Sequence, residues 1–374
     1  MRILHIITNL GQGGAEAVLY RLITVSPPDI EHVVVSLMDD SYYGTRLRAA
    51  GIRVYTLDSP RGWVTLSGVL KLRQIISSLA PDVVQTWMYH ADLVGGLIAR
   101  LAGVRTVVWG IRHSNLAADK TSFSARTAAW FCARLSSWVP AAIVCCSEQA
   151  TRVHQAIGYE AAKFTVIPNG YDLGCFSPNN EARARLRAEW RIADNEILLG
   201  LVARWDPQKD HENLLKALAL LKANGTNFRC ILVGTEMNSS NITLTDLIQS
   251  LALQDRVMLL GSRDDIPAVM NALDLHVLSS VGEAFPNTVA EAMACGTPCV
   301  VTDVGDAALI VGDTGWVVPA QDDVALAHGI EDALTSLLAK GRASLGSACR
   351  WRIEQNFGID KMINRYFMLW KECK

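Results

Sequence analysis

Residues 281–301 read VGEAFPNTVAEAMACGTPCVV, and this segment shows the unit from which the fold is built. Pro286 suits the first turn of a helix, where its missing N–H group costs no hydrogen bond. A helix is therefore predicted from Pro286 or Asn287 to about Cys295, and Gly296 stands where a helix usually ends. The apolar run TPCVVTD follows as a predicted strand. Helix, turn and buried strand in this order are typical of an α/β protein.

The same segment places two carboxylates around the start of the predicted helix. Glu283 belongs to the preceding loop and Glu291 to the second turn; in one unbroken helix they would lie roughly 12 Å apart along the axis. The amides of Asn287 and Thr288 open the helix, and an exposed helix start is a suitable seat for phosphate. Two carboxylates that accept hydrogen bonds from hydroxyl groups, beside an anion site, suit a sugar nucleotide.

Strand-like and helix-like segments alternate along the whole chain, which predicts parallel sheets covered on both faces. The first set of predicted strands is ILHII, HVVVSL, RVYTL, DVVQT, RTVVW, AAIVCC and FTVIP. The second set is EILLGLV, FRCILVG, RVMLLG, LDLHVLS and TPCVVTD. We therefore predict two doubly wound, Rossmann-like domains that face a cleft, with ligands at the carboxyl ends of the strands.

The turn-rich segment PNGYDLGCFSPNN lacks periodicity and predicts a linker between the two domains. The predicted domains are residues 1–170 and 171–355. Residues 356–374 predict a helix that packs back towards the first domain. Its apolar stripe consists of Ile359, Met362, Ile363, Tyr366, Leu369 and Trp370.

Composition narrows the class of protein. Of the 374 residues, 50% are hydrophobic and 19% are charged, which indicates large buried cores. The nine cysteines show no paired metal spacing, so we expect free thiols in a reducing compartment. The first apolar run is too short for a signal peptide. The sequence contains no uninterrupted run of about 18 apolar residues, so no membrane span is expected. We expect a cytoplasmic protein.

Charge is divided unevenly between the predicted domains. Residues 1–170 hold 16 Lys and Arg and 11 Asp and Glu, a balance of +5; residues 171–374 hold 19 and 26, a balance of −7, which together give −2. The positive half suits an anionic partner, although an ordinary solvated surface explains the same asymmetry.

Five motifs in order, GGAE, IRH, IPNGYD, ARWDPQKD and GEAFPNTVAEAMACGTP, resemble those of the retaining family 4 glycosyltransferases of the GT-B fold. The resemblance covers essentially the full chain. It implies transfer of a sugar from a nucleotide diphosphate donor, with UDP favoured, to a hydroxyl group, with the anomeric configuration kept. It also implies that the first domain binds the acceptor and the second the nucleotide sugar.

Carried over by position, the resemblance implies that Glu283 binds the donor sugar and that Glu291 binds the ribose hydroxyls. Arg204 and Lys209 match the pair that stabilises the departing diphosphate. The planar guanidinium of Arg204 and the mobile ammonium of Lys209 both suit that task. The alternative for Arg204 and Lys209 is a surface ion pair with Asp206 or Asp210. Many relatives carry Gly at the position of Asp210.

The remaining donor-site candidates are Gly13 and Gly14 in the first domain and Phe285, Pro286, Asn287 and Thr288 in the second. Gly11, Gly13 and Gly14 follow the first strand and let backbone approach a phosphate closely. Glu16 replaces the third small residue of the dinucleotide fingerprint, so no nicotinamide cofactor is expected. A merely tight turn is the alternative.

Two histidines compete for the sugar-side role in the first domain. The resemblance implies that His113 reaches the donor sugar, and His90, Tyr89 and Arg112 are assigned to the acceptor side. A packed histidine is the structural alternative for His113.

The segment TAAWFCARLSSWVPAAIVCC offers a separate hypothesis. Trp130, Phe131, Leu135 and Trp138, near Arg126 and Arg134, are typical of a helix face that lies on an anionic membrane. The same residues also suit the core side of a helix.

No cofactor and no metal is expected, because no aspartate cluster with metal spacing accompanies the site. The expected partners are a nucleotide sugar and a glycan or lipid-linked saccharide of cell-surface polysaccharide or glycolipid synthesis, with no nucleic acid. The alternatives are a nucleotide-sugar epimerase, a glycoside hydrolase with paired carboxylates, and a non-catalytic nucleotide-sugar binder.

Overall fold

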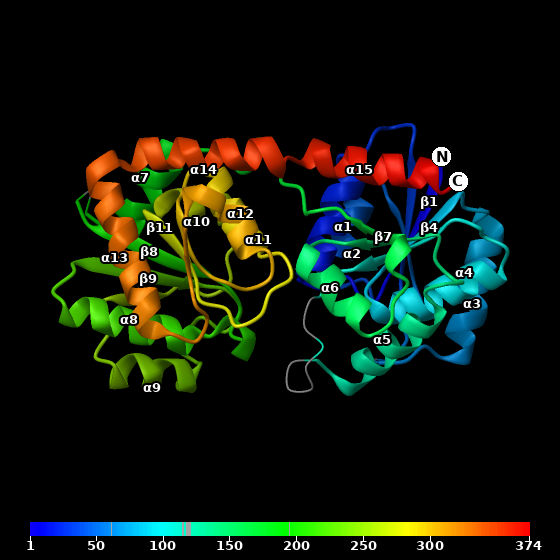
Figure 1. Cartoon of the computed structure of the whole chain (residues 1–374), viewed down its shortest axis with the longest axis horizontal. Helices are drawn as coiled ribbons and strands as arrows, with labels where there is room; N and C mark the ends of the chain where they lie inside the picture. Colours follow the sequence, from blue (N-terminus) through cyan, green and yellow to red (C-terminus); the bar gives the residue numbers. More distant parts are fainter. Residues whose placement is uncertain (61, 114–115, 117–120, 194) are drawn as a thin grey trace. The chain divides into compact units, whose positions relative to one another are not determined.

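The computed structural model describes residues 1–60, 62–113, 116, 121–193 and 195–374. These divide into two compact units (Figure 1). Unit 1 comprises Met1–Gly170 and Ile359–Lys374, and unit 2 comprises Tyr171–Gly358. The first crossing from one unit to the other falls within the turn-rich segment PNGYDLGCFSPNN.

The described residues of unit 1 form a seven-stranded parallel sheet in the order β3-β2-β1-β4-β5-β6-β7. The strands are β1 (Arg2–Ile7), β2 (Glu31–Ser36), β3 (Arg53–Thr56), β4 (Val83–Trp87), β5 (Val107–Ile111), β6 (Ala142–Cys145) and β7 (Phe164–Val166). The central strands are apolar along their length because both faces of the sheet are covered. All seven were predicted from the sequence.

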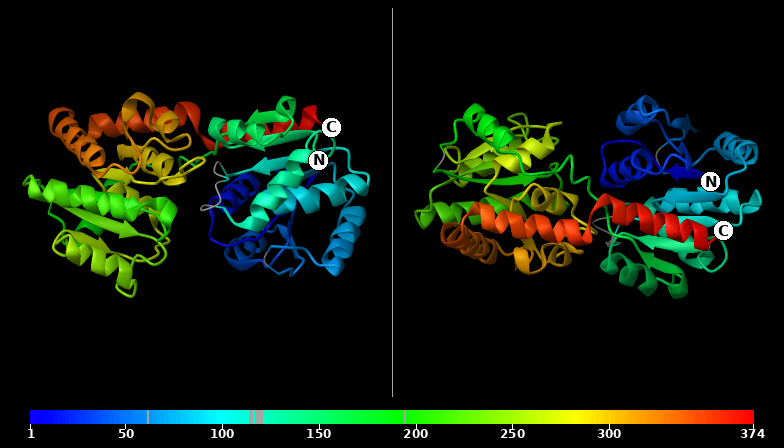
Figure 2. Two further views of the ribbon diagram at one scale, coloured as in Figure 1. Left: turned by 60° about the horizontal axis from the view of Figure 1, so that its bottom comes forward. Right: turned by 90° about the horizontal axis from the view of Figure 1, so that it is seen from above.

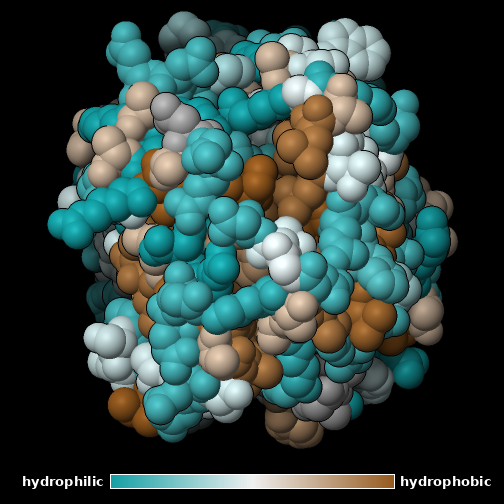
Figure 3. Space-filling view, turned by 90° about the vertical axis from the view of Figure 1, so that its left-hand side faces the viewer, coloured by the Kyte–Doolittle hydropathy of each residue, from teal (hydrophilic) through white to brown (hydrophobic). Residues whose placement is uncertain are grey.

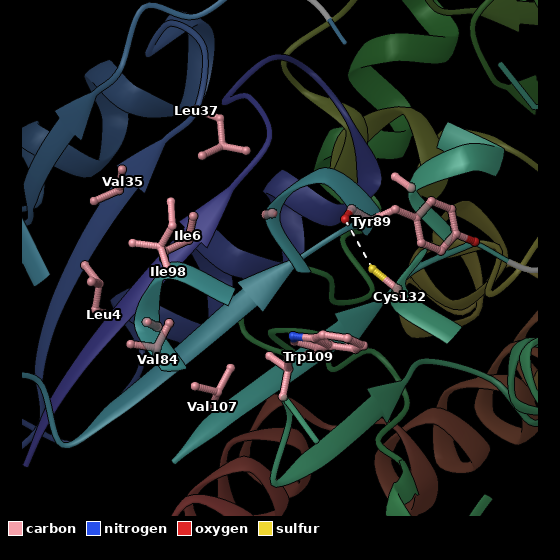
Figure 4. Close-up of a cluster of buried hydrophobic side chains, with 14 of the residues drawn as sticks. Leu4, Ile6, Val35, Leu37, Val84, Tyr89, Ile98, Val107, Trp109 and Cys132 are labelled. Carbon is pink, nitrogen blue, oxygen red and sulfur yellow. Dashed lines mark hydrogen bonds between the residues drawn. The ribbon is translucent and has the colours of Figure 1, made fainter. Parts of the chain in front are cut away.

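Helices cover both faces of this sheet (Figure 2). They are α1 (Gly14–Thr24), α2 (Ser41–Ala49), α3 (Leu66–Leu79), α4 (Gly96–Leu101), α5 (Phe123–Leu135), α6 (Glu148–Ala156) and α15 (Ile359–Glu372), with a π-helix η1 (Ala91–Gly95) and a 3₁₀ turn η2 (Ala161–Lys163). One core lies beneath α3 to α6, where Leu4, Ile6 and Val84 of the strands meet Ile98 of α4 (Figure 4). The other core lies beneath α1, α2 and α15.

Helix α15 confirms the predicted apolar stripe. Its buried residues are Ile359, Met362, Ile363, Tyr366, Leu369 and Trp370. They pack with residues of β1, β4 and α1. The last helix of the chain therefore completes the core of unit 1.

The described residues of unit 2 form a six-stranded parallel sheet in the order β10-β9-β8-β11-β12-β13. The strands are β8 (Ile197–Val202), β9 (Phe228–Val233), β10 (Val257–Leu259), β11 (Leu275–Leu278), β12 (Cys299–Thr302) and β13 (Trp316–Val318). Five of them were predicted. The sixth, β13, was missed because three residues after Gly315 give too short a pattern.

Unit 2 is covered by α7 (Asn180–Glu189), α8 (His211–Ala223), α9 (Ile242–Ser250), α10 (Ile266–Ala272), α11 (Asn287–Ala294), α12 (Ala307–Val311), α13 (Asp323–Lys340) and α14 (Arg342–Asn356), with the 3₁₀ turns η3 (Pro207–Lys209) and η4 (Gly312–Thr314). Helix α11 confirms the predicted helix, and Gly296 after it has φ +74°. The surface on the side of α7 and α13 is largely hydrophilic, with apolar side chains between polar ones (Figure 3).

All nine cysteines are free thiols, as predicted. Within the described ranges, no helix combines the length and the apolar character that crossing a bilayer requires. Within the same ranges, no three His, Cys, Asp or Glu side chains gather as metal ligands would.

Candidate active site

Two neighbouring strands of unit 2 position the candidate site. Strands β8 and β11 pair in the sheet, so the segments that follow them leave the same edge side by side. The hydroxyl of Ser279 donates to the carbonyl of Lys209 at 2.8 Å, and the amide of Val281 donates to the carbonyl of Gln208 at 2.8 Å. These bonds tie the turn η3 to the loop that carries Glu283.

Lys209 and Glu283 form an ion pair at this edge. Nζ of Lys209 lies 2.5 Å from Oε1 of Glu283, and the side chains are 21% and 13% exposed. The hydroxyl of Ser280 donates to the same Oε1 at 2.8 Å. The structure thus joins two predicted site residues whose contact the sequence did not predict, and the partial burial strengthens their interaction relative to a surface pair.

Arg204 forms the ion pair that the sequence analysis left open as an alternative. Its Nε and Nη2 donate to Oδ2 of Asp206 at 3.1 and 2.8 Å, and its side chain is 58% exposed. Partial burial acts to raise the pKa of Asp206, but the hydrogen bonds from the Gln208 amide and Arg204 outweigh it, and the pKa is lowered. Asp206 therefore stays ionised and holds the guanidinium.

Asp210 lies in a left-handed backbone conformation, with φ +47° and ψ +56°. Glycine would adopt this conformation without strain, whereas a residue with a side chain is strained there. The Asp210 carboxylate accepts a hydrogen bond from the amide of Asn213 at 3.2 Å and caps α8. The capping bond offsets part of the backbone strain.

Helix α11 begins with Pro286 at the N-cap position, and no side chain caps its amides from there. The side-chain oxygen of Asn287 accepts a hydrogen bond from the hydroxyl of Tyr171 at 2.7 Å. Phe285 is buried against Phe357, with ring centroids 5.5 Å apart. These contacts fix the position of the helix start, where the sequence predicts the phosphate seat.

Gly305 supports the loop that carries Glu283, and this role was not predicted from the sequence. Its φ is +56°, and a Cβ atom added there would lie 2.5 Å from the carbonyl oxygen of Glu283 and 2.6 Å from that of Ala284. The amide of Asp306 donates to the Ala284 carbonyl at 3.1 Å. The signal in the sequence is the glycine of VTDVGD, directly after a predicted strand.

Glu291 lies on α11, half-buried among fully buried neighbours that include Val289 and Met293. Its assignment to the ribose and that of Thr288 to the phosphate remain predictions.

In unit 1, Gly13 is the N-cap of α1 and Gly14 its first residue. The carboxylate of Glu16 folds back against Gly13, so this acid lies at the positive end of the helix dipole. A phosphate at this helix start would meet that carboxylate, and the donor role of Gly13 and Gly14 remains a prediction.

Tyr89 and His113 lie near one another, with ring centroids 6.5 Å apart. Tyr89 is 3% exposed, and its hydroxyl hydrogen-bonds Nε2 of His154 at 2.7 Å. Cys132 donates to its carbonyl (Figure 4). Burial of Tyr89 favours a packing role over an acceptor contact. His90 is half-buried, and burial lowers its pKa.

Arg112 links three parts of unit 1. It donates to the side-chain oxygen of Asn169 at 2.5 Å and to the hydroxyl of Tyr366 on α15, and its guanidinium lies 4.9 Å from the ring centroid of Trp87. These contacts engage the side chain in holding α15 and the end of unit 1 against β4 and β5.

Asp92 is a buried acid that sequence reasoning missed. It lies in the π-helix η1 after Met88, whose φ is +73°, and π-helices often mark functional segments. Oδ1 accepts hydrogen bonds from the Thr86 hydroxyl at 2.6 Å and the Gly110 amide at 3.2 Å. Burial raises the pKa of Asp92 to about 8 despite these bonds.

Comparison with known proteins relates this chain to glycosyltransferases. Residues 12–174 match the family described as "Glycosyltransferase Family 4", and residues 182–350 match the one described as "Glycosyl transferases group 1". EpsF of Bacillus subtilis (strain 168), which bears a glycosyltransferase name, is 30% identical over 309 residues, which span 81% of this chain and 79% of EpsF.

A second relative is UDP-Gal:alpha-D-GlcNAc-diphosphoundecaprenol alpha-1,3-galactosyltransferase of Escherichia coli, which is 24% identical over 80% of this chain and 78% of its own. Among solved structures, HepE of Anabaena in complex with UDP-glucose matches with a TM-score of 0.85 and 25% identity, with 100% of both chains covered. WaaG, a glycosyltransferase involved in lipopolysaccharide biosynthesis, matches with a TM-score of 0.76 and 16% identity over 98% of this chain and 99% of its own. The two Rossmann-like domains of the GT-B fold are thus confirmed.

Proposed function

We propose a specific reaction from one premise, which is that the chain belongs to glycosyltransferase family 4. We infer that this glycosyltransferase moves a sugar from a UDP-sugar to a hydroxyl group of a lipid-linked saccharide and keeps the anomeric configuration. The E. coli relative is named for a UDP-galactose donor and a diphosphoundecaprenol-linked acceptor, and HepE binds UDP-glucose. These names support the donor and acceptor classes of the proposal.

The observation that carries the proposal is the Lys209–Glu283 pair beside the start of α11. An ammonium group has three donors, and the described contacts of Lys209 use one of them. The others are available to oxygen atoms of a diphosphate. As the sugar departs, negative charge builds on that diphosphate, and a cation already held in place stabilises it without reorganisation.

Arg204 is proposed as the second cation. Asp206 engages Nε and Nη2 and leaves Nη1 of the guanidinium outside this pair. Because the side chain is 58% exposed, it can turn towards a phosphate while Asp206 holds one edge. The amides of Asn287 and Thr288 at the start of α11 would add neutral donors with the positive end of the helix dipole.

Glu283 is proposed to bind the donor sugar. Its Oε1 accepts hydrogen bonds from both Lys209 and Ser280, which fix the orientation of the carboxylate. Glu291 is proposed to hold the ribose hydroxyls. We propose that the donor phosphate takes the acceptor proton on the same face, as the resemblance implies, with no protein base and no divalent ion.

We propose that the reaction serves cell-surface polysaccharide synthesis in the cytoplasm, where UDP-sugars are available. A thermal-shift panel of nucleoside diphosphates tests the donor class, because a ligand that binds the folded state raises Tm. UDP is expected to raise Tm in the presence of EDTA, and Lys209→Ala is expected to reduce that shift. No shift with any nucleotide would refute the proposal.

Stereochemistry needs a second measurement. Incubation with a UDP-sugar and an undecaprenyl-diphosphate saccharide, followed by NMR of the new linkage, is expected to show the anomer of the donor. The opposite anomer would refute retention. Conversion of the UDP-sugar without any acceptor to another nucleotide sugar would indicate an epimerase instead.

A further inference from the structure

Unit 1 exposes a group of large apolar side chains on α3, α5 and the segments next to them. They are Trp63 (71% exposed), Leu66 (76%), Leu70 (59%), Phe123 (82%), Trp130 (50%), Phe131 (46%) and Trp138 (50%). We call these seven residues the docking face. A contiguous patch of exposed apolar side chains usually marks a binding surface.

The structure tests the core-side alternative that the sequence left open for the segment around α5. The buried side of the helix consists of small residues, which are Ala128, Ala129, Cys132 and Ala133. Trp130, Phe131 and Trp138 are exposed, and of the four apolar residues considered from the sequence, Leu135 alone packs against the core. The core-side alternative is therefore wrong for Trp130, Phe131 and Trp138.

The two segments of the docking face lie on one side of unit 1. Helices α3 and α5 pack on the same core and so cover the same face of the sheet. A Cβ atom at Gly62 would lie 3.7 Å from the hydroxyl of Ser124. Trp63 and Phe123 directly adjoin these two residues, so the two segments of the docking face approach each other where α3 and α5 begin.

The charge around the docking face is positive. Lys71, Arg73, Arg126 and Arg134 are exposed on α3 and α5. Residues 59–81 and 120–147 contain no Asp or Glu. The guanidinium of Arg134 lies 5.0 Å from the ring centroid of Trp130.

Glu160 lies near the end of α5 and interacts with Lys163. The amide of Glu160 donates a hydrogen bond to the hydroxyl of Ser136 at 2.9 Å. The ammonium of Lys163 donates to the carbonyl of Ser137 at 2.6 Å. Burial lowers the pKa of Lys163, and the Glu160 carboxylate opposes part of that shift.

These features favour one occupant. A second copy of the chain in a two-fold contact would bring the four basic residues against their own equivalents, and like charges oppose such a pairing. Tryptophan is enriched at the boundary between lipid and water, and Lys and Arg are attracted to anionic headgroups. We propose that the docking face binds unit 1 to an anionic lipid bilayer, with its aromatic side chains in the headgroup region. This inference does not depend on the donor or the stereochemistry proposed above.

The test measures co-sedimentation of the full chain with vesicles of phosphatidylglycerol and with vesicles of phosphatidylcholine. The wild type is expected to bind the first at low salt, to bind the second weakly, and to lose affinity as salt rises. The apolar variant Trp63→Ser with Phe123→Ser is expected to lose at least about tenfold in affinity. The charge variant Arg126→Gln with Arg134→Gln is expected to lose about 25-fold, at about fivefold per basic residue.

A matched control comes from unit 2. Leu338 and Trp351 are 84% and 63% exposed, so Leu338→Ser with Trp351→Ser removes similar apolar groups from another surface. This control is expected to bind vesicles as the wild type does. All variants are expected to show the same Tm shift with UDP as the wild type, which separates this inference from the proposed reaction.

Three results would overturn the proposal. The first is an absence of binding to phosphatidylglycerol, and the second is an equal loss in the control variant. The third is a dimer in sedimentation velocity that Trp63→Ser with Phe123→Ser converts to a monomer, since a second copy would then cover the docking face.

Discussion

Lys209→Ala tests the central assignment because it removes the cation and leaves its surroundings in place. The substitution deletes the ammonium that lies 2.5 Å from Oε1 of Glu283. The hydroxyl of Ser280 still donates to that oxygen at 2.8 Å. The turn η3 keeps its own ties to the β11 loop, because these involve only the backbone of Lys209 and Gln208.

The expected effect on turnover is much larger than the effect on stability. Loss of one preorganised donor to a developing anion lowers kcat by about 10²–10³, or roughly 3–4 kcal/mol. Glu283 loses its counter-ion but keeps the Ser280 hydroxyl, so we expect the free energy of unfolding to fall by only about 1 kcal/mol, at the lower end for a buried polar group that loses one partner. The two numbers together separate a catalytic role from a structural one.

The assay measures release of UDP from a UDP-sugar in the presence of acceptor, alongside urea unfolding. Lys216→Ala is the matched control, since Lys216 pairs with Glu212 on α8 and both side chains are well exposed. The control is expected to keep turnover within about twofold of the wild type, as is usual for an exposed position. The double variant Lys209→Ala with Glu283→Gln is expected to lose less than the sum of the single losses, because the two groups are in contact. Near-normal turnover of Lys209→Ala would refute the reasoning.

Four further predictions address the surroundings of this pair. Gly305→Ala places a Cβ atom 2.5 Å from the Glu283 carbonyl oxygen and is expected to lower kcat at least about tenfold. The control Gly225→Ala, at φ +82° with no neighbour within 4 Å, is expected to lower stability and leave kcat unchanged. Equal kcat in both variants would exclude a supporting role for Gly305. Asp210→Gly relieves the left-handed strain and loses the cap, so urea unfolding is expected to show a change within about 1 kcal/mol, while Asp210→Ala keeps the strain and is expected to be clearly less stable than either. Glu291→Gln is expected to weaken UDP binding about tenfold or more in calorimetry, and an unchanged Kd would remove the ribose assignment. Burial lowers the pKa of His211 to about 4, so between pH 4 and 6.5 the unfolded chain binds more protons than the folded one. The free energy of unfolding is therefore expected to fall as pH drops through this window, by on the order of 3 kcal/mol from His211. His211→Gln is expected to reduce this pH dependence, and a difference from the wild type that does not change with pH would contradict the prediction.

The sequence predicted the elements well because their signals are local. Twelve strands follow from apolar, β-branched runs, and the start of α11 follows from the geometry of Pro286. The end of α11 follows from Gly296, whose φ is +74°. The stripe of α15 follows from helical spacing alone. In each case the residues that form the signal lie within a single helix, strand or turn.

The contacts of the site were less predictable because they depend on the order of strands in the sheet. Lys209 and Glu283 meet because β8 and β11 are neighbours, although β9 and β10 lie between them in the chain. The ion pair of Arg204 with Asp206 is local and was foreseen as an alternative. Trp63 lies just before α3, and its exposure depends on packing that the neighbouring residues in the sequence do not reveal.

The ion pairs have a consequence for how the proposed catalysis is divided between binding and turnover. Asp206 and Glu283 each neutralise much of the cation beside them, so the ligand-free site attracts a ground-state diphosphate less than two unpaired cations would. The same carboxylates hold the cations in position for the larger charge of the departing diphosphate, and interactions that strengthen towards the transition state raise kcat. Removal of Lys209 should therefore lower kcat by a larger factor than it weakens UDP binding. A loss of UDP affinity as large as the loss of kcat would show that Lys209 acts in ground-state binding alone.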